Sequence, residues 1–413
     1  MSFSNLEIDA PVFHPRRVSA PNHGPISRSA LSEAPTNELL VDVMSSRQCW
    51  QYRGLVAAWV ISLFVFYLWW FRGEHIESWV RFTVNSLLLT WTLALPGYFL
   101  FFVSRMKQVA TNLTLPVGWR VAMVATRAPS EPFAVVKQTL EAMLTQQYPH
   151  ETWLADEDPT AEILCWCEAH GVHISTRKNA PGYHRDQWPR RTKCKEGNLA
   201  YFYDHYGYDQ YDFVVQLDAD HVPSKGYLEA ILKPFLDPAV GYVSAPSICS
   251  TNARSSWSAR GRLYAESIMH GPLQAGYTNG FAPLCIGSHY AVRTRALREI
   301  GGIGPELAED HSTTLMMNGH GWRGVHALDA IAHGEGPPTL ADCFTQEFQW
   351  SRSLMVVMLT VMPKYWGRLS WPLRIQFLFS QLWYPIFGGT TLCGLTLPLV
   401  AIITKEPWVR VSY

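Results

Sequence analysis

The sequence predicts a mixed α/β domain with a mostly parallel sheet, inserted between membrane-spanning helices. Two long runs without charged residues, 54–71 and 82–104, come before the domain. From residue 119 onward, a strand, a polar turn and a helix occur twice in succession, which favours parallel strands joined by helical crossovers. An apolar run at 213–217 then ends on Asp218 and Asp220. This pattern indicates a buried strand that presents acids at its C-terminal edge, where open α/β sheets bind ligands.

The composition is typical of a protein that lies partly in lipid. The 413 residues include 17 tryptophans, and only 16% are charged. Lys+Arg and Asp+Glu both number 34, so the chain has no basic excess and we expect no nucleic-acid partner. Each uncharged run is about long enough to cross a hydrocarbon core of ~30 Å. Basic and aromatic residues at their ends favour two membrane spans over a buried globular pair.

The chain divides into regions of different composition. The N-terminal region is rich in Pro, Ser and Asn and is expected to be disordered. The five expected regions are a disordered tail (1–48), a transmembrane hairpin (49–107), the α/β domain (108–350), amphipathic helices at the membrane surface (351–372) and a transmembrane segment (373–413).

Two features refine the membrane prediction. Basic residues outside the hairpin slightly outnumber those in its connection. We therefore expect a multi-pass protein of the inner (plasma) membrane with its α/β domain in the cytoplasm. The last uncharged run, after Arg374, is longer than one span requires. We expect it to be broken or kinked at Pro385 and Gly388-Gly389, or strongly tilted.

The acids that end the central strand suggest a metal site. Asp218 and Asp220 lie on the same face of an extended segment, so both can reach one hard cation that also contacts substrate phosphates. The alternative is an ordinary surface turn. Most of the histidines, including His221, are expected to be packing residues, and His333 is the one most worth testing as a metal ligand.

Three other stretches carry residue types suited to a ligand site. Lys195 stands where a basic loop enters a helix, which suits a diphosphate clamp or an ordinary solvated loop. Gly287 and Ser288 permit close approach of the backbone to a ligand. Glu309 and Asp310 begin another helix, where acids commonly serve as caps and dipole partners.

In their order and spacing, these stretches resemble the processive family 2 glycosyltransferases of the GT-A fold, the group that contains bacterial cellulose, curdlan and hyaluronan synthases. The resemblance covers about residues 50 to 400 and is closest to the cellulose and curdlan type. The matching stretches are 119–132, the acidic turn 156–158, Lys195-Glu196-Gly197-Asn198, Asp218-Ala219-Asp220, Gly287-Ser288, Glu309-Asp310 and 346–350.

The resemblance implies a role for each motif. Asp310, next to Glu309, would be the general base that deprotonates the acceptor hydroxyl during one inverting displacement. Asp218 and Asp220 would hold Mg²⁺ or Mn²⁺, which neutralises charge on the departing diphosphate. The residues implied to bind the donor are Thr126, Glu131, Asp156 or Asp158, Lys195 and Asp218. Those implied to bind the acceptor are Gln346, Trp350, Gly287 and Ser288.

The sequence departs from the family pattern in three places. Gln349 replaces the arginine of the Gln-x-x-Arg-Trp motif, so either Arg352 compensates or the product differs from cellulose. Glu157 stands between Asp156 and Asp158, which leaves open which carboxylate contacts uridine. Processive members also have more membrane helices, and some carry a cyclic-di-GMP-binding domain. We therefore expect a truncated membrane region, or a membrane subunit or homo-oligomer that completes it.

The expected function is that of a membrane-embedded, UDP-glucose-dependent hexosyltransferase. It would extend a cellulose-, curdlan- or mixed-linkage-like β-glucan, and the linkage depends on positioning that the sequence does not determine. One alternative is non-processive transfer of a sugar to a polyprenyl phosphate or lipid. Trp350 argues against it, because a lipid carrier needs no platform for stacking a sugar. The other alternative is a catalytically inactive membrane subunit of a polysaccharide export complex, which Gln349 favours.

Overall fold

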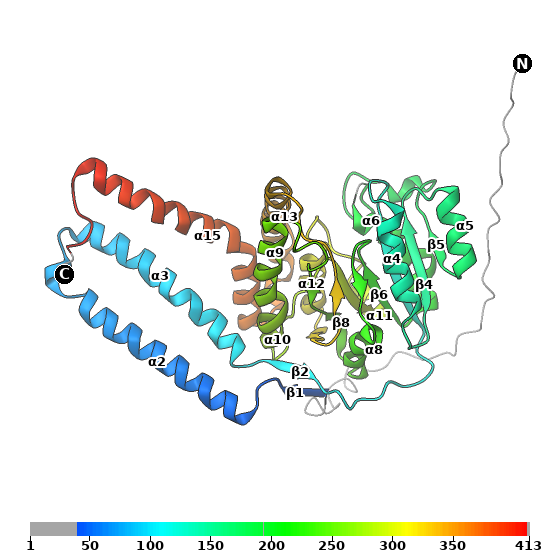
Figure 1. Ribbon diagram of the computed structural model, residues 1–413, viewed down its shortest axis with the longest axis horizontal. Coiled ribbons are helices and arrows are strands. Elements are labelled where there is room, and N and C mark those ends of the chain that lie inside the picture. Colours follow the sequence, from blue (N-terminus) through cyan, green and yellow to red (C-terminus); the bar gives the residue numbers. More distant parts are fainter. Residues whose placement is uncertain (1–38, 193, 411–413) are drawn as a thin grey trace, which may run out of the picture. The chain divides into compact units, whose positions relative to one another are not determined.

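The computed structural model describes residues 39–192 and 194–410, so most of the expected disordered tail lies outside the described residues (Figure 1). Order begins before the expected boundary at residue 48. Strand β1 (Leu40–Asp42) pairs antiparallel with β2 (Lys107–Val109), and Leu39 is buried in the core. Residues 39–42 are ordered because they pair with a distant segment, and their local composition gave no sign of that pairing.

Three helices among the described residues are long and apolar enough to cross a membrane: α2 (Ser46–Trp70), α3 (Trp79–Val103) and α15 (Trp371–Thr404). Figure 1 shows α3 lying between α2 and α15. The Tyr52 hydroxyl on α2 donates to the Leu100 carbonyl on α3 at 2.9 Å. On the other side, the rings of Tyr98 and Phe379 stack with centroids 3.9 Å apart. The first two helices therefore form the expected hairpin.

The boundaries near the C-terminus differ from those expected. Helix α15 continues through Pro385 and Pro398, so it is not broken there, and the alternatives of a kink or a strong tilt stay predictions. Helix α13 (Leu340–Thr360) begins before residue 351 and includes the Gln346–Trp350 segment, followed by the short helix α14 (Met362–Tyr365). The predicted position of these helices at the membrane surface stays a prediction.

The domain is built on a seven-stranded sheet with the order β11-β8-β10-β6-β3-β4-β5, counted over the described residues. Its strands are β3 (Val121–Arg127), β4 (Glu151–Asp156), β5 (His173–Ser175), β6 (Phe213–Leu217), β8 (Val240–Ser244), β10 (His289–Arg293) and β11 (Arg323–His326). All neighbours are parallel except β10, which is antiparallel to β6 and β8. The predicted α/β class with a mostly parallel sheet is confirmed.

Both faces of the sheet are covered. In β3, Met123 and Ala125 pack into one apolar cluster, while Ala122 and Val124 pack into a second cluster on the opposite face. The main helices of the domain are α4 (Phe133–Leu144), α5 (Ala161–His170), α6 (Lys195–Phe202), α8 (Tyr227–Leu232), α9 (Trp257–Ile268), α11 (Thr294–Glu299) and α12 (Glu309–Gly319). Burial on both faces explains why the strands read as continuous apolar runs.

The strand register brings distant motifs to one edge. Leu217, the last residue of β6, pairs with Ala125 on β3 and with His289 on β10. Asp218 therefore follows Leu217 at the point where Thr126 follows Ala125 near the end of β3 and Ser288 precedes β10. The Asp218 backbone N–H donates to the Ser288 carbonyl at 2.7 Å. The antiparallel β10 is what carries the Gly287-Ser288 loop to the acids.

Candidate active site

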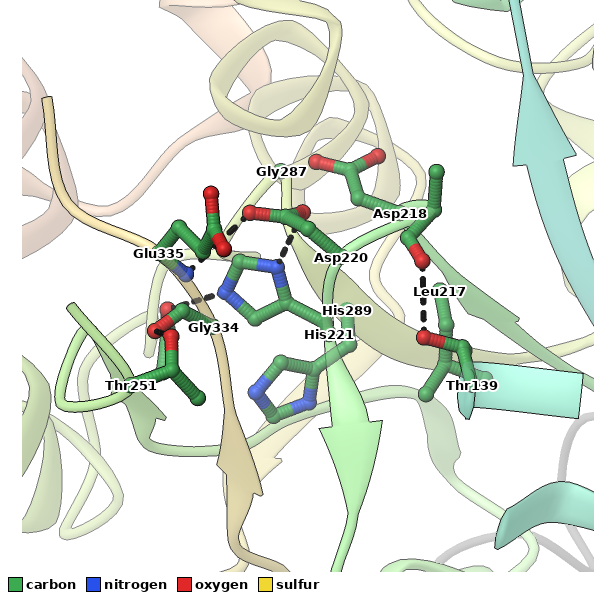
Figure 2. A network of polar contacts seen from close by, with 12 residues as sticks. Thr139, Leu217, Asp218, Asp220, His221, Thr251, Gly287, His289, Gly334 and Glu335 are labelled. Carbon is green, nitrogen blue, oxygen red and sulfur yellow. Dashed lines mark hydrogen bonds and ion pairs between the residues drawn. The ribbon is translucent and has the colours of Figure 1, made fainter. Parts of the chain in front are cut away.

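The acids after β6 form a cluster with His221. One ligand atom each from Asp218, Asp220 and His221 lies within 4.8 Å of the others, and this is the candidate metal-binding group among the described residues. Figure 2 shows the two carboxylates beside each other next to Gly287, with the His221 ring below Asp220. The side chains of Asp218 and Asp220 are 35% and 30% exposed, so both can reach a ligand.

His221 supports Asp220 from below. Its Nδ1 lies 2.9 Å from Asp220 Oδ1, and its Nε2 lies 2.9 Å from Ser247 Oγ. Burial lowers the pKa of His221, but the hydrogen bond and charge of Asp220 outweigh this and raise it. Burial likewise raises the pKa of Asp220, but the contact with His221 outweighs it and lowers the pKa. Through these contacts His221 holds the Asp220 carboxylate in place.

A small sheet holds His221 in place. It consists of β7 (Val222–Pro223), β12 (Ala332–His333) and β9 (Ser247–Ile248). A Cβ on Gly334 would lie 2.3 Å from the His221 ring, so the chain after β12 packs directly on the imidazole. Glu335 donates its backbone N–H to Asp220 Oδ2 at 3.2 Å. His333 lies outside the metal-binding group and contacts Ser250 Oγ at 2.9 Å, so His221 rather than His333 contacts the acids.

Lys195 connects the acids after β6 to the Gly287 loop. Its Nζ donates to Asp218 Oδ1 at 2.5 Å and to the Gly287 carbonyl at 2.6 Å. Burial lowers the pKa of Lys195, but the charges of Asp218, Glu309 and Asp310 outweigh burial and raise it. The ammonium group therefore stays protonated in the middle of several carboxylates.

The three residues after Lys195 each make a contact that accounts for their residue type. Glu196 accepts the backbone N–H groups of Arg190 and Arg191 at 2.8 and 3.0 Å, which closes the preceding loop. A Cβ on Gly197 would lie 2.0 Å from the Arg191 carbonyl, so only glycine fits. Asn198 donates to the Ala155 carbonyl on β4 at 2.8 Å. These contacts hold the start of α6, and with it Lys195, against the sheet.

Glu309 and Asp310 begin α12 on the other side of Lys195. Asp310 Oδ1 accepts the His311 backbone N–H at 2.7 Å, and Asp310 lies next to Gly287, where an added Cβ would be 3.3 Å from Oδ2. Burial raises the pKa of both carboxyl groups, and the charge of Asp310 raises that of Glu309 further, while Lys195 lowers both. The pair therefore contains a base with an increased affinity for protons, next to the Gly287 loop.

The predicted donor-binding residues fall into two groups. Glu131 accepts the Ala128 N–H at 2.6 Å, and its pKa is raised by burial and by the charges of Asp218 and Asp220, so it belongs to the cluster. Thr126 lies beside it on the sheet edge, with Oγ1 3.5 Å from the Leu217 carbonyl.

The acidic turn after β4 is engaged in ion pairs. Asp156 is fully buried, and both of its oxygens lie 3.0 Å from Arg127 Nη1. Asp158 is half-exposed and pairs with Lys178 at 2.5 Å. Glu157 pairs with the buried Arg177. Of the two aspartates that the sequence left open, Asp158 is therefore the one with an accessible carboxylate.

Two of the predicted acceptor residues, Gln346 and Trp350, lie on α13, close to the start of α12. Gln346, Trp350 and Ser353 share one face of α13 because they are spaced by four and three residues. Ser353 Oγ accepts the backbone N–H of Ala308 at 2.8 Å, and Ala308 directly precedes Glu309. This bond brings the face that carries Trp350 to the segment that carries the predicted base.

The first turns of α15 also contact the site. His311, next to Asp310, lies 2.9 Å from Ser380 Oγ through its Nε2 and packs edge-on against the Phe377 ring. Gln376 exchanges hydrogen bonds with the backbone of Ala282 at 3.0 and 2.6 Å. A candidate membrane helix is therefore bonded directly to the segment that carries the predicted base.

Comparisons with known proteins identify related sequences and structures. Residues 213–406 match the family model described as glycosyl transferase family group 2, which confirms the resemblance. The UDP-forming cellulose synthase catalytic subunit of Pseudomonas fluorescens (strain SBW25) is 25% identical over 298 residues, covering 70% of this chain and 38% of that protein. Cellulose synthase 1 of Komagataeibacter xylinus is 23% identical over 370 residues, covering 84% of this chain and 23% of that protein. This chain thus spans well under half the length of these relatives.

Similar solved structures include the mannosyltransferase PcManGT from Pyrobaculum calidifontis, determined in complex with GDP-Man and Mn²⁺. It is 16% identical with a TM-score of 0.49, covering 77% of this chain and 92% of that chain. Glucosyl-3-phosphoglycerate synthase from Mycobacterium tuberculosis, in complex with Mn²⁺, UDP and glucosyl-3-phosphoglycerate, is 15% identical with a TM-score of 0.37, covering 64% and 80%. From the family match and the cellulose synthase relatives, this chain contains a glycosyltransferase family 2 domain, similar at low identity to cellulose synthase catalytic subunits.

Proposed function

We propose that this chain is a membrane-embedded inverting glycosyltransferase that adds glucose from UDP-glucose to a growing β-glucan. The observation that carries this proposal is the contact of Lys195 with both Asp218 and the Gly287 carbonyl, while Asp310 lies next to Gly287, whose added Cβ would be 3.3 Å from Asp310 Oδ2. A metal-type acid pair, a cation and a buried base from separate segments thereby meet at one sheet edge. This is what a sugar-nucleotide transfer site requires.

The residues divide the chemistry between them. Asp218 and Asp220 would hold Mg²⁺ or Mn²⁺, and the bound ion would neutralise charge on the departing diphosphate. Asp310 takes the proton from the acceptor hydroxyl while that oxygen bonds to the anomeric carbon of glucose. The bond to the diphosphate breaks at the same time, and UDP leaves with its electron pair. The raised pKa of Asp310 makes it a stronger base than an exposed aspartate.

The donor and acceptor would approach from different sides of this base. Thr126, Glu131 and Lys195 flank Asp218 and are proposed to contact the donor, together with Asp158 rather than the buried Asp156. The proposed acceptor residues are Gln346 and Trp350 on α13 and the Gly287-Ser288 loop. The three candidate spans support a position in the inner membrane, and the basic-residue bias favours a cytoplasmic domain.

The charges next to the proposed acceptor residues favour a neutral glycan over a lipid phosphate. Arg262 contacts Gln346 and Trp350, but it is already paired with Glu347 at 2.7 Å and lies 3.6 Å from Glu266. These three charged groups together carry one net negative charge, which would repel a polyprenyl phosphate. The assembled acid cluster also argues against an inactive subunit.

Turnover of labelled UDP-glucose by the purified chain in lipid vesicles tests the proposal. With Mg²⁺ or Mn²⁺ we expect UDP release and incorporation of glucose into polymer, and linkage analysis of that polymer identifies the glucan. Asp310→Asn keeps the size of the side chain and should lower the rate by about 10²–10⁴-fold. Asp186→Asn, at an exposed acid, is the matched control. Absence of wild-type turnover with any UDP-sugar would refute the proposed function.

A further inference from the structure

Arg262 on α9 contacts both residues proposed to bind the acceptor. Its Nη2 donates to Gln346 Oε1 at 3.2 Å, and its guanidinium carbon lies 4.6 Å from the centroid of the Trp350 ring. The side chain is only 7% exposed, and its Nη1 lies 2.7 Å from Glu347 Oε1. Arg262 belongs to none of the motifs in the sequence, yet it holds the Gln346–Trp350 segment from a neighbouring helix.

These contacts determine how Gln346 and Trp350 face a ligand. A guanidinium only donates hydrogen bonds, so the Gln346 oxygen must point toward Arg262 and the amide NH₂ is left to donate elsewhere. A guanidinium that lies over an aromatic ring covers one of its faces. Because Trp350 is 37% exposed, part of the indole remains accessible to a ligand.

The same contacts connect the acceptor residues to the candidate membrane helix. Glu347 Oε2 accepts the Tyr384 hydroxyl of α15 at 2.6 Å, while its Oε1 pairs with Arg262. The connection thus runs from α9 through α13 to α15. Arg262 is fixed by more than one partner, so its guanidinium is held in a single place over Trp350.

Arg262 also bears on the departure at position 349. The sequence left open whether Arg352, which is exposed, compensates for the missing motif arginine or the product differs from cellulose. Arg262 instead brings a buried guanidinium to Gln346 and Trp350 from a different helix.

We propose that Arg262 is a positioning residue of the acceptor site. It holds the Gln346 amide and the Trp350 indole in the orientation that binds the terminal sugar of a neutral glycan, with that sugar on the ring face opposite the guanidinium. The inference rests on the proposed function. A purely structural contact between α9 and α13 is the alternative, and it predicts no selective effect on the acceptor.

Arg262→Lys in the full chain, reconstituted in lipid vesicles, separates these possibilities. Lysine keeps the charge but loses the planar stacking and the fork of donors. Three quantities are measured with UDP-glucose and an added soluble β-glucan oligosaccharide: the KM of each substrate and the ratio of transfer to donor hydrolysis. We expect the oligosaccharide KM to rise by about fivefold or more and the ratio of transfer to donor hydrolysis to fall. The UDP-glucose KM should stay within about twofold of the wild-type value.

Two further variants make the result decisive. Arg260→Lys, an exposed arginine on the same helix, should match the wild type. Tyr384→Phe removes the hydroxyl that holds Glu347 and should change the oligosaccharide KM in the same direction as Arg262→Lys, to a smaller extent. An unchanged oligosaccharide KM in Arg262→Lys overturns this inference alone. So does a parallel loss of UDP binding, which would identify Arg262 as a structural contact. If the wild type shows no turnover, both the proposed function and the inference on Arg262 are refuted.

Discussion

Gly287→Ala tests the position of the proposed base without changing any ionisable group. Gly287 does not have a positive φ, so alanine is compatible with its backbone and any effect must come from the added methyl. That methyl would lie 3.3 Å from Asp310 Oδ2, 3.6 Å from its Cγ and 3.8 Å from Glu309 Oε1. The closest of these distances is tighter than most contacts that a Cβ makes in proteins, so the Asp310 carboxylate must yield.

The expected effect is moderate. The Asp310 carboxylate has to move by a few tenths of an ångström, and a displacement of 1 Å lowers an enzymatic rate by about 10²-fold. We therefore expect the kcat of Gly287→Ala to fall by about 3–10-fold, which corresponds to roughly 0.7–1.4 kcal/mol of activation free energy. The Gly287 carbonyl that holds Lys195 is retained, so the KM for UDP-glucose should not change.

The assay is the initial rate of glucose incorporation from labelled UDP-glucose, together with UDP affinity measured by titration. Gly182→Ala is the control, because a Cβ at that position meets no atom within 4 Å. A Gly287→Ala enzyme with the wild-type kcat would refute the reasoning, since Asp310 would then not act from the position described. A loss of UDP affinity equal to the loss in rate would also refute it.

Three more predictions follow from the site. Asp310 acts only when ionised and burial raises its pKa, so kcat should fall as the pH drops through a value above the ~4 of an exposed aspartate, as a pH–rate profile will measure. Chelation of divalent ions should abolish turnover, and Asp220→Asn should raise the Mn²⁺ concentration for half-maximal rate by about tenfold or more. Arg127→Met leaves the buried Asp156 carboxylate unpaired and should lower the free energy of unfolding by about 3–5 kcal/mol, seen as a lower Tm.

The outcomes that would contradict these predictions are distinct. A rate that stays constant down to pH 4 would exclude Asp310 as the base. Full activity in excess chelator would exclude a metal-dependent transfer. A Tm of Arg127→Met equal to that of the wild type would show that the Arg127–Asp156 pair contributes little. The double variant Arg127→Met/Asp156→Asn should recover part of the lost stability, because no unpaired charge remains.

Local patterns were sufficient for most elements of the fold. The apolar runs that predict β3 and β6 are buried on both faces, and the uncharged runs 54–71 and 82–104 form α2 and α3. Pro385 shows the limit of such patterns. The sequence left a break, a kink and a tilt open, and α15 runs as one helix through Pro385 and Pro398.

The site depended more on distant contacts. The sequence marked Asp218, Asp220, Lys195 and Asp310 as separate candidates, and the structure brings them together. It did not mark His221 as a partner of the acids, although the ring directly follows Asp220 in the chain. The small sheet turns the imidazole back onto Asp220, and its strands come from three distant segments.

By itself, the amino-acid sequence determined the α/β class, the two long apolar helices α2 and α3 and the placement of the acids after β6, because hydrophobic periodicity and strand-end residues are local properties. Only the tertiary structure decided that β10 runs antiparallel and brings Gly287 next to Asp310. It also decided that Asp156 forms a buried ion pair with Arg127 and that the Arg262 guanidinium lies over the Trp350 ring. Such contacts depend on strand register and helix packing between segments far apart in the chain, and no short-range pattern encodes them.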